Sequence, residues 1–367
     1  MRGIPLYFFL LTIASVLFCT DPFRTQFDAV EDAQRYESAV KTGPPALVDT
    51  LLVMTWNIRY GGARIAFFYE CGGFRYSMTE EEAKDDIQAV ANKINEVDPD
   101  ILFLQEVDVC SKRSAYIDQM QYLLDHTPLN YGAYASIWKG DCIPSDGLGR
   151  IDMGNAVLSK WQFNEATRIA LPARTDQDAL QGYFFFHRNI LKCGVRLPGE
   201  RLLYCLTVHT EPWASDGTKK KHVDLFKDEL DKLQAAGDQF IAGGDLNALP
   251  PGSLEWSHFP DAECTDSRFK ADDYAGEEEL LSPLYETYTA AIPTDVYTAN
   301  EARFHTFTGD TAFGWTRTLD HLFSNGPLVT GSGKALQSGE LPDGSAGIPT
   351  LPLSDHAPLV VKMRVSP

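Results

Sequence analysis

Short apolar runs alternate with amphipathic segments from about residue 50 to the end of the chain. The run LLVMTWNI at 51–58 has the length and the β-branched and aromatic content of a buried strand. Thr79 and Glu82 have the spacing of a capping box, and apolar residues behind them recur at helical spacing from Ala83 to Val97. This pattern predicts a helix with one buried face, and the run ILFLQ at 101–105 predicts the next buried strand.

The rest of the pattern predicts more strands and two more helices. One helix begins near Ser114, and the other carries Val223, Phe226 and Leu230 on its apolar side. This mixture indicates an α/β fold in which two packed β-sheets are flanked by helices. Two stretches, 61–79 and 248–303, have no regular pattern, and such stretches are often functional. The further strands are predicted at 131–138, 155–159, 184–197, 201–210, 239–245, 316–324 and 356–365.

The first 20 residues have the pattern of a signal peptide, because Arg2 precedes an apolar run that ends at Phe18. No clear cleavage site follows, so an uncleaved membrane anchor is the alternative. Residues 21–49 are polar and are expected to form a spacer, and residues 50–367 are expected to form one domain. The protein is therefore expected to be secreted, or to lie in or be anchored to the lumen of the secretory pathway.

The charge balance disfavours one class of binding partner. The chain has 32 Lys and Arg residues against 51 Asp and Glu residues, which gives a net charge of −19. Such a surface disfavours tight binding of long nucleic acids, which depends on clustered cations. A bound divalent cation can still dominate one pocket, so a phosphate ester remains a suitable substrate.

The cysteines indicate disulfides. Six remain if Cys19 belongs to the signal segment, and an even number in a secretory protein suggests up to three disulfides. One pairing is favoured, because Cys193 and Cys205 flank Pro198–Gly199 and would face each other across a hairpin. No Cys/His spacing typical of zinc domains is present.

Polar residues with catalytic potential stand at the ends of the predicted strands. In α/β folds, ligand sites collect where strands stop and loops begin. Each residue alone is common in turns, but their joint occurrence at successive strand ends favours a shared site. They are Asn57, Glu106, His209, Asp245 with Asn247, Asp320, and Asp355 with His356.

The motifs around these residues resemble the successive motifs of the endonuclease/exonuclease/phosphatase superfamily. They are WNIRY (56–60), QEV (105–107), GNAVLS (154–159), VHT (208–210), GGDLN (243–247), HTF (305–307), LDHLF (319–323) and SDHAPLV (354–360). That superfamily includes secreted deoxyribonucleases, abasic-site endonucleases, sphingomyelinases, inositol-polyphosphate phosphatases and deadenylases. The resemblance implies a four-layered α/β sandwich and Mg²⁺-dependent hydrolysis of a phosphate ester, with Mn²⁺ as an alternative ion.

The resemblance also implies roles for individual residues. Glu106 is the best metal ligand, with Asn57 and Asp355 near the ion, and such hard oxygen donors suit Mg²⁺. Asp245 and Asn247 are expected to orient or deprotonate the attacking water and to hold a phosphate oxygen, and His356 is expected to act as a base or to contact the phosphate. The proton acceptor is either Asp245 or His356.

The remaining expected roles concern the phosphoryl group and the catalytic histidine. Asp320 is expected to accept a hydrogen bond from the ring of His356 and to fix its tautomer. His209 is expected to donate to the phosphoryl oxygens. Asn57, Arg188 and Asn189 are candidates for substrate contact, and for Arg188 and Asn189 a structural ion pair is the alternative. His305 and His321 are not expected to belong to the core site.

The ester itself is not specified by the sequence. A phosphodiesterase of nuclease type is favoured, and a sphingomyelinase-like or inositol-phosphate hydrolase is the alternative. The aromatic residues at 67–76 suit either stacking on bases or contact with lipid, although a small packed subcluster is slightly favoured. A catalytically silent secreted binding module is the alternative from another class, and it predicts lost ligands, whereas every expected position is filled. No stable partner protein is implied, and a monomer is expected.

Overall fold

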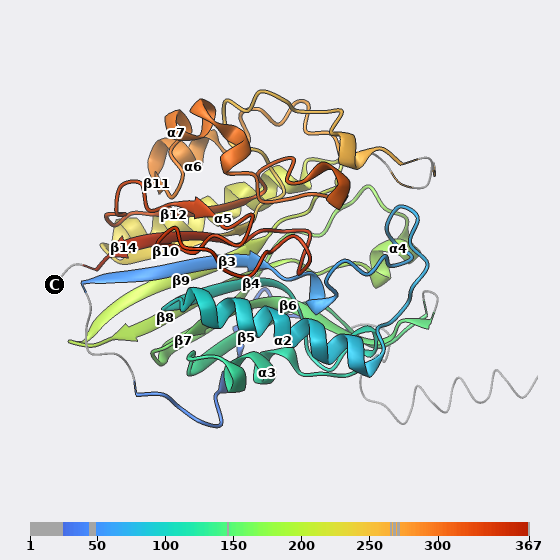
Figure 1. Ribbon diagram of the computed structural model, residues 1–367, viewed down its shortest axis with the longest axis horizontal. Helices are drawn as coiled ribbons and strands as arrows, with labels where there is room; N and C mark the ends of the chain where they lie inside the picture. Colours follow the sequence, from blue (N-terminus) through green and yellow to red (C-terminus); the bar gives the residue numbers. More distant parts are fainter. Residues whose placement is uncertain are drawn as a thin grey trace, which may run out of the picture.

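The structure is a computed structural model that describes residues 25–43, 49–144, 147–264, 266, 269 and 272–365. The expected signal segment at 1–20 lies outside the described residues. Two seven-stranded mixed β-sheets pack against each other, and helices cover their outer faces (Figure 1). This arrangement confirms the predicted α/β sandwich.

One sheet has the strand order β13-β14-β3-β4-β6-β5-β2. Its central strands β3 and β4 are parallel, and all other pairs in this sheet are antiparallel. The strands are β2 (Gln34–Glu37), β3 (Thr50–Asn57), β4 (Ile101–Asp108), β5 (Tyr131–Ile143), β6 (Gly149–Ser159), β13 (Lys334–Ala335) and β14 (Leu359–Arg364).

The other sheet has the strand order β1-β7-β8-β9-β10-β12-β11. Strands β9 and β10 are parallel, and the rest are antiparallel. The strands are β1 (Val30–Asp32), β7 (Phe163–Ala170), β8 (Asn189–Leu197), β9 (Arg201–His209), β10 (Gln239–Asp245), β11 (Thr289–Ala290) and β12 (Asp320–Ser324).

Three layers of apolar side chains hold the sandwich together. The central layer, with Val53 and Phe103 from one sheet and Leu191 and Ile241 from the other, fills the space between the sheets. A second layer joins α2 (Glu80–Val97) and α3 (Gln119–His126) to the outer face of the β3–β4 sheet. A third joins α5 (Thr218–Ala236) and α6 (Ser282–Thr287) to the outer face of the other sheet. Two further short helices are α4 (Ala179–Phe184) and α7 (Thr294–Ala299).

Local sequence signals explain several element boundaries. Helix α2 begins with the predicted capping box, in which the Thr79 side chain accepts from the Glu82 backbone and the Glu82 side chain accepts from the Thr79 backbone. Helix α5 ends at Gly237, which adopts a φ of +80° as its C-cap. Strand β10 then follows directly, so this helix leads the chain back to the centre of the sheet.

The structure corrects three expectations about local structure. The segment 25–43, expected to be part of a spacer, supplies edge strands β1 and β2, which pair with β7 and β5. The predicted strand at 184–197 begins only at Asn189, because α4 ends at Phe184. The helix predicted from Ser114 starts at Gln119, after a short 3-10 turn that ends at Ser114.

The disulfide expectation is also corrected. Cys71 and Cys264 form the disulfide, and it joins the two irregular stretches predicted from sequence. Cys193 and Cys205 are direct cross-strand partners, as expected, but both remain buried thiols. Cys110 and Cys142 are also free.

Within the described part of the chain, none of the helices has the length and apolar character needed to cross a membrane.

Candidate active site

The register of the strands brings the predicted residues to one edge of the sandwich. Asn57 is the last residue of β3, and Asp245 is the last residue of β10. In the sheet that contains β10, Asp245 lies opposite His209 on one side and Asp320 on the other. The two parallel pairs therefore end at the same edge, where the two sheets meet.

Glu106 reaches this edge through a distortion of β4. The pairing of β4 with β6 shifts between Leu104 and Val107, and Glu106 has a φ of +57°. A bulge of this kind re-aims a side chain, and left-handed backbone at a Glu is a strained conformation that often marks function. The preceding Gln105 turns inward instead, where its Nε2 donates to the Thr207 hydroxyl at 2.8 Å.

Asn57 links two carboxylates. Its Nδ2 donates to Glu106 Oε1 and to Asp245 Oδ2, both at 3.1 Å, while its Oδ1 accepts from the Arg59 backbone N–H at 3.0 Å. The Asn57 backbone carbonyl accepts from the Ser354 hydroxyl at 2.8 Å, which ties the start of the site to the segment before β14. The amide thus holds the two carboxylates in a fixed relation.

Asp245 is the centre of the cluster. Its Oδ2 lies 3.4 Å from His209 Nε2 and 3.5 Å from His356 Nε2, in addition to its bond from Asn57. Its Oδ1 accepts from the Asn247 backbone N–H at 2.9 Å. Burial raises the pKa of Asp245, although the neighbouring His356 opposes this rise.

His356 has a carboxylate beside each ring nitrogen. Asp320 Oδ2 lies 2.7 Å from Nδ1, and Asp245 lies beside Nε2. Burial alone would lower the pKa of His356, but Asp320 and Asp245 outweigh it and raise the pKa above its ordinary value. The Phe307 ring packs edge-on against the imidazole, with 4.8 Å between the ring centroids. The ring is therefore fixed in orientation and favoured in its protonated form.

His209 behaves differently. Burial, with the positive charges of Arg188 and His356 nearby, holds the pKa of His209 well below its ordinary value. Its Nε2 faces Asp245 and lies 4.0 Å from Glu106 Oε1, whereas its buried Nδ1 has no hydrogen-bond partner among the described residues. Neutral His209 therefore presents one ring nitrogen to the carboxylates.

Asn247 adopts a φ of +46°, which Asn tolerates better than most residues. Its Nδ2 donates to the Thr210 carbonyl at 3.2 Å, and its backbone N–H donates to Asp245 Oδ1 at the end of β10. Asn247 therefore lies just after β10, and its side-chain amide is engaged by the backbone of Thr210.

Two carboxylates provide oxygen donors that suit a hard cation. Burial raises the pKa of Glu106, and the charge of Asp355 raises it further. A divalent ion would relieve this repulsion, and its preferred ligands are carboxylate oxygens. A second group, Asp245, Asp320 and His356, has ligand atoms within 4.8 Å of one another, but His356 already pairs with both of these carboxylates. Glu106 and Asp355 are thus the better pair of donors.

Sequence reasoning missed the role of Arg59 as an organiser. Its Nε forms an ion pair with Asp355 Oδ2 at 3.3 Å, and its other nitrogens contact Glu70 and the Ala63 and Ile65 carbonyls. Arg59 therefore connects the irregular loop after β3 to a metal-ligand candidate. Its place inside the WNIRY motif was the available signal.

Arg188 and Asn189 are engaged within the protein rather than pointing into the cluster. Arg188 forms an ion pair with Glu211 at 3.2 Å and donates to the His209 carbonyl at 3.2 Å. Asn189 is fully buried and donates to the Ser136 carbonyl at 2.9 Å. Arg188 therefore supports the backbone of His209, and Asn189 supports the sheet interior.

His305 and His321 lie outside the cluster. His321 forms hydrogen bonds with the Ala248 carbonyl and the Tyr285 hydroxyl, and His305 forms one with the Trp315 carbonyl.

The aromatic residues of the loop after β3 differ in burial. Phe67 is fully buried in a small apolar subcluster, whereas Phe74 is 73% exposed.

Comparisons with solved structures agree with this architecture. An endonuclease/exonuclease/phosphatase family protein from Leptotrichia buccalis C-1013-b has a TM-score of 0.51 at 16% identity, and the match covers 86% of this chain and 100% of that one. One from Bacteroides vulgatus has a TM-score of 0.51 at 14% identity, covering 86% and 99%. The human Nocturnin catalytic domain with bound sulfate has a TM-score of 0.50 at 16% identity, covering 90% and 97%. At these identities the likeness concerns the fold alone.

Sequence comparison is more specific. No curated protein matches the chain. The model of the Endonuclease/Exonuclease/phosphatase family matches residues 54–356, a range that begins in β3 and ends at His356. The chain therefore belongs to the endonuclease/exonuclease/phosphatase family.

Proposed function

We propose that this protein is a divalent-metal-dependent phosphodiesterase of nuclease type. The observation that carries the proposal is the convergence of Asn57, Glu106, His209, Asp245 and His356 into one set of mutual contacts at a sheet edge. Members of this family are hydrolytic phosphoesterases, which supports the same reaction class. A catalytically silent binding module would not require a cluster of buried ionisable side chains that shift one another's pKa values.

Glu106 and Asp355 would hold the ion, with Asn57 orienting Glu106 through its amide. Mg²⁺ is the expected ion and Mn²⁺ the alternative, because the donors are oxygens rather than thiolates. When bound, the ion would stabilise the negative charge that develops on the phosphoryl oxygens. Arg59 would keep the Asp355 carboxylate in place through the ion pair at 3.3 Å.

The protein's own groups would move the protons. Carboxylates beside both ring nitrogens favour His356 as a donor, so it would donate Nε2–H to a phosphoryl oxygen. Asp245 would then take the proton of the attacking water, which Asn247 helps to orient, as the water oxygen bonds to phosphorus and the ester bond from phosphorus to the leaving oxygen breaks. The leaving oxygen would take its proton from solvent. A positioned base of this kind contributes roughly 10²–10⁴-fold to the rate. His209 would donate to a second phosphoryl oxygen.

The substrate is proposed to be a nucleic-acid phosphodiester bound through short-range contacts. The net charge of −19 predicts weak, salt-sensitive binding that relies on divalent ions. Phospholipid is the second candidate, because Phe74 and Tyr76 expose aromatic surface on the loop after β3. The disulfide supports action in an oxidising compartment, as expected of a secretory protein, and we expect a monomer.

A substrate panel tests the proposal. Plasmid DNA, RNA, sphingomyelin and inositol phosphates would be assayed with Mg²⁺, with Mn²⁺ and with EDTA. We expect phosphodiester hydrolysis that EDTA abolishes and that Asn247→Ala and His356→Ala reduce by about 10²-fold or more. His126→Ala, at an exposed site on α3, is the control that should keep full activity. Unchanged activity in both site variants would disprove the assignment.

A further inference from the structure

A small polar pocket lies at the free edge of the β13–β14 sheet, and none of its residues belongs to the catalytic cluster. Its volume is about 200 Å³, below the range of roughly 300–1,000 Å³ for drug-sized ligands. The 3-10 turn that ends at Arg303 forms one wall, and the segment from Lys334 to Glu340 forms the other. Its size therefore suits a small metabolite.

Two cations line the pocket. The Arg303 guanidinium lies against the Phe304 ring, with 5.9 Å from Cζ to the ring centroid. In the described part of the chain it has no ion pair or side-chain hydrogen bond, whereas Arg113 and Arg317 are each paired with aspartates. Among the described residues, the Lys334 ammonium donates one hydrogen bond, to the Pro342 carbonyl at 2.9 Å, and interacts electrostatically with Asp343, which leaves further donor capacity. A free guanidinium fork is well matched to a carboxylate or phosphate.

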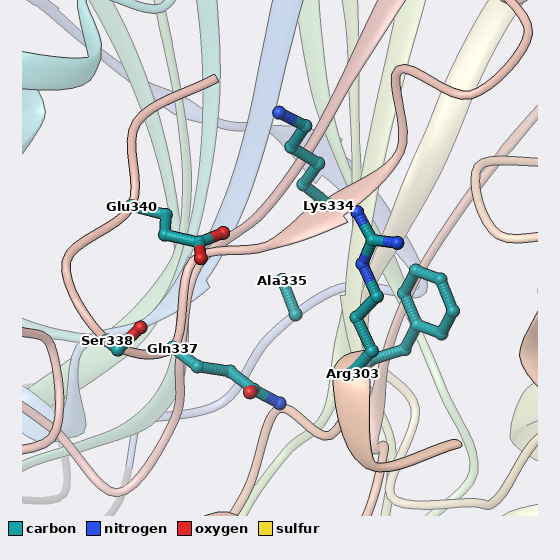
Figure 2. A pocket seen from close by; sticks show the side chains of 7 residues that line it. Arg303, Lys334, Ala335, Gln337, Ser338 and Glu340 are labelled. Atoms are coloured by element: carbon teal, nitrogen blue, oxygen red, sulfur yellow. The ribbon is translucent and has the colours of Figure 1, made fainter. Parts of the chain in front are cut away.

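The same pocket also offers free acceptors. The Glu340 carboxylate has no partner among the described residues, and Figure 2 shows it reaching toward the space above Ala335 from the side opposite Arg303. Gln337 Nε2 already donates to the Ala302 and His305 carbonyls, so only the amide oxygen remains available. Arg303 and Glu340 do not form an ion pair with each other within the described chain, although both line one small space.

The two cations and the carboxylate lie on different sides of one pocket, so a ligand that pairs with both must carry both signs of charge. A simple anion would bind Arg303 and Lys334 but would be repelled by Glu340. A simple amine would bind Glu340 but would be repelled by the two cations. We propose that this pocket binds a small zwitterion, in which an oxyanion contacts Arg303 and Lys334 and a protonated amine a few bonds away contacts Glu340. This proposal is independent of the proposed catalytic function.

Calorimetric titration of the full chain in EDTA tests the proposal. The probes are β-alanine and phosphoethanolamine, in which a short ethylene chain separates the ammonium from a carboxylate or a phosphate. Inorganic phosphate and ethylamine supply each charge alone. We expect saturable binding of at least one zwitterion, with each half-probe about tenfold weaker or more. Binding of both zwitterions would indicate general oxyanion recognition, and binding of phosphoethanolamine alone would indicate a phosphate ligand.

Matched variants assign the binding to this pocket. Arg303→Gln and Glu340→Gln should each weaken zwitterion binding by about tenfold or more. Arg364→Gln and Glu286→Gln, at exposed positions elsewhere, should leave it unchanged. If Glu340→Gln strengthens binding of the zwitterion, the pocket is a plain anion site and the proposal fails. It also fails if neither pocket substitution changes binding, or if neither zwitterion binds.

Discussion

Asn57 donates a hydrogen bond from its Nδ2 to Asp245 Oδ2 at 3.1 Å, although the two residues lie 188 positions apart and in different sheets. The same nitrogen donates to Glu106. One neutral amide thus separates two carboxylates in a buried setting, where like charges would otherwise repel each other.

Replacing that amide by a carboxylate tests its importance. In Asn57→Asp a third acceptor faces Glu106 and Asp245 in place of their shared donor. We expect a loss of about 10²-fold or more in kcat and a loss of stability of about 1–3 kcal/mol, because buried acceptors lose their donor. Assays at saturating Mg²⁺ and urea unfolding would measure the two effects. Asn164→Asp, at an exposed amide, is the control, and a fully active Asn57→Asp enzyme would contradict the assignment.

Asp320 and His356 should act as a unit, because the 2.7 Å contact fixes the imidazole. Asp320→Asn and His356→Ala are each expected to lower kcat by roughly 10²–10⁴-fold. The double variant should be no worse than the poorer single variant, since the second substitution removes a function already lost. A double-mutant cycle on the best substrate measures this, and multiplicative losses would show that the two residues act separately.

Arg188 offers a choice between positioning and substrate contact. Its ion pair with Glu211 and its hydrogen bond to the His209 carbonyl favour a positioning role. Different guanidinium nitrogens make these two contacts, and a single lysine ammonium cannot reproduce that geometry. Arg188→Lys should therefore lower kcat by about tenfold with little change in KM, and should cost about 1–3 kcal/mol of stability. The matched control is Arg196→Lys, on the exposed side of β8. A rise in KM at unchanged kcat would instead favour phosphate contact.

The sequence indicated which strand-end residues lie close together more reliably than it indicated the edge strands of the fold. Asn57, Asp245 and His356 were identifiable because each follows or precedes an apolar strand, and strand register then brings them together. The short strand β1 could not be identified from the sequence, because Val30–Asp32 contains two acidic residues and an exposed valine. Pairing with β7 makes this segment a strand.

Tertiary contacts also overrode local patterns elsewhere. The run FFF at 184–186 has strand-like composition, but these side chains are only partly buried, because Phe184 ends α4 and Phe185 is the C-cap of that helix. The disulfide partner of Cys71 lies 193 positions away, and no local spacing specifies such a pair. Arg59 meets Asp355 only because β3 and β14 are neighbours in the sheet.

The disulfide between Cys71 and Cys264 should stabilise the fold. It closes a loop of 193 positions, and disulfides of this kind typically contribute about 2–4 kcal/mol. Cys71→Ser should lower the free energy of unfolding by that amount, and added reductant should have the same effect on the parent protein but none on the variant. Cys142→Ser, at an exposed free thiol, is the control. Thiol labelling under denaturing conditions should leave only Cys71 and Cys264 protected among the described cysteines.

His222 should make the protein less stable in mild acid. Its Nδ1 accepts from the Glu211 backbone N–H at 3.3 Å, and its Nε2 lies 2.7 Å from the Pro172 carbonyl, an arrangement that requires the neutral ring. Burial lowers the pKa of His222 to about 4. The unfolded chain, with a pKa near 6.5, therefore binds a proton that the folded protein does not, so stability falls as the pH drops from about 6.5 to 4.

Urea unfolding at several pH values between 4 and 7 would measure this term. His222 should contribute a slope of up to about 1.4 kcal/mol per pH unit. In His222→Gln, whose amide donates and accepts without titrating, the curve should be flatter by that amount. His126→Gln, at an exposed histidine, should leave the slope unchanged, because an exposed ring is solvated in both states. Parallel curves for the parent protein and His222→Gln would show that His222 is protonated in the fold as readily as in the unfolded chain.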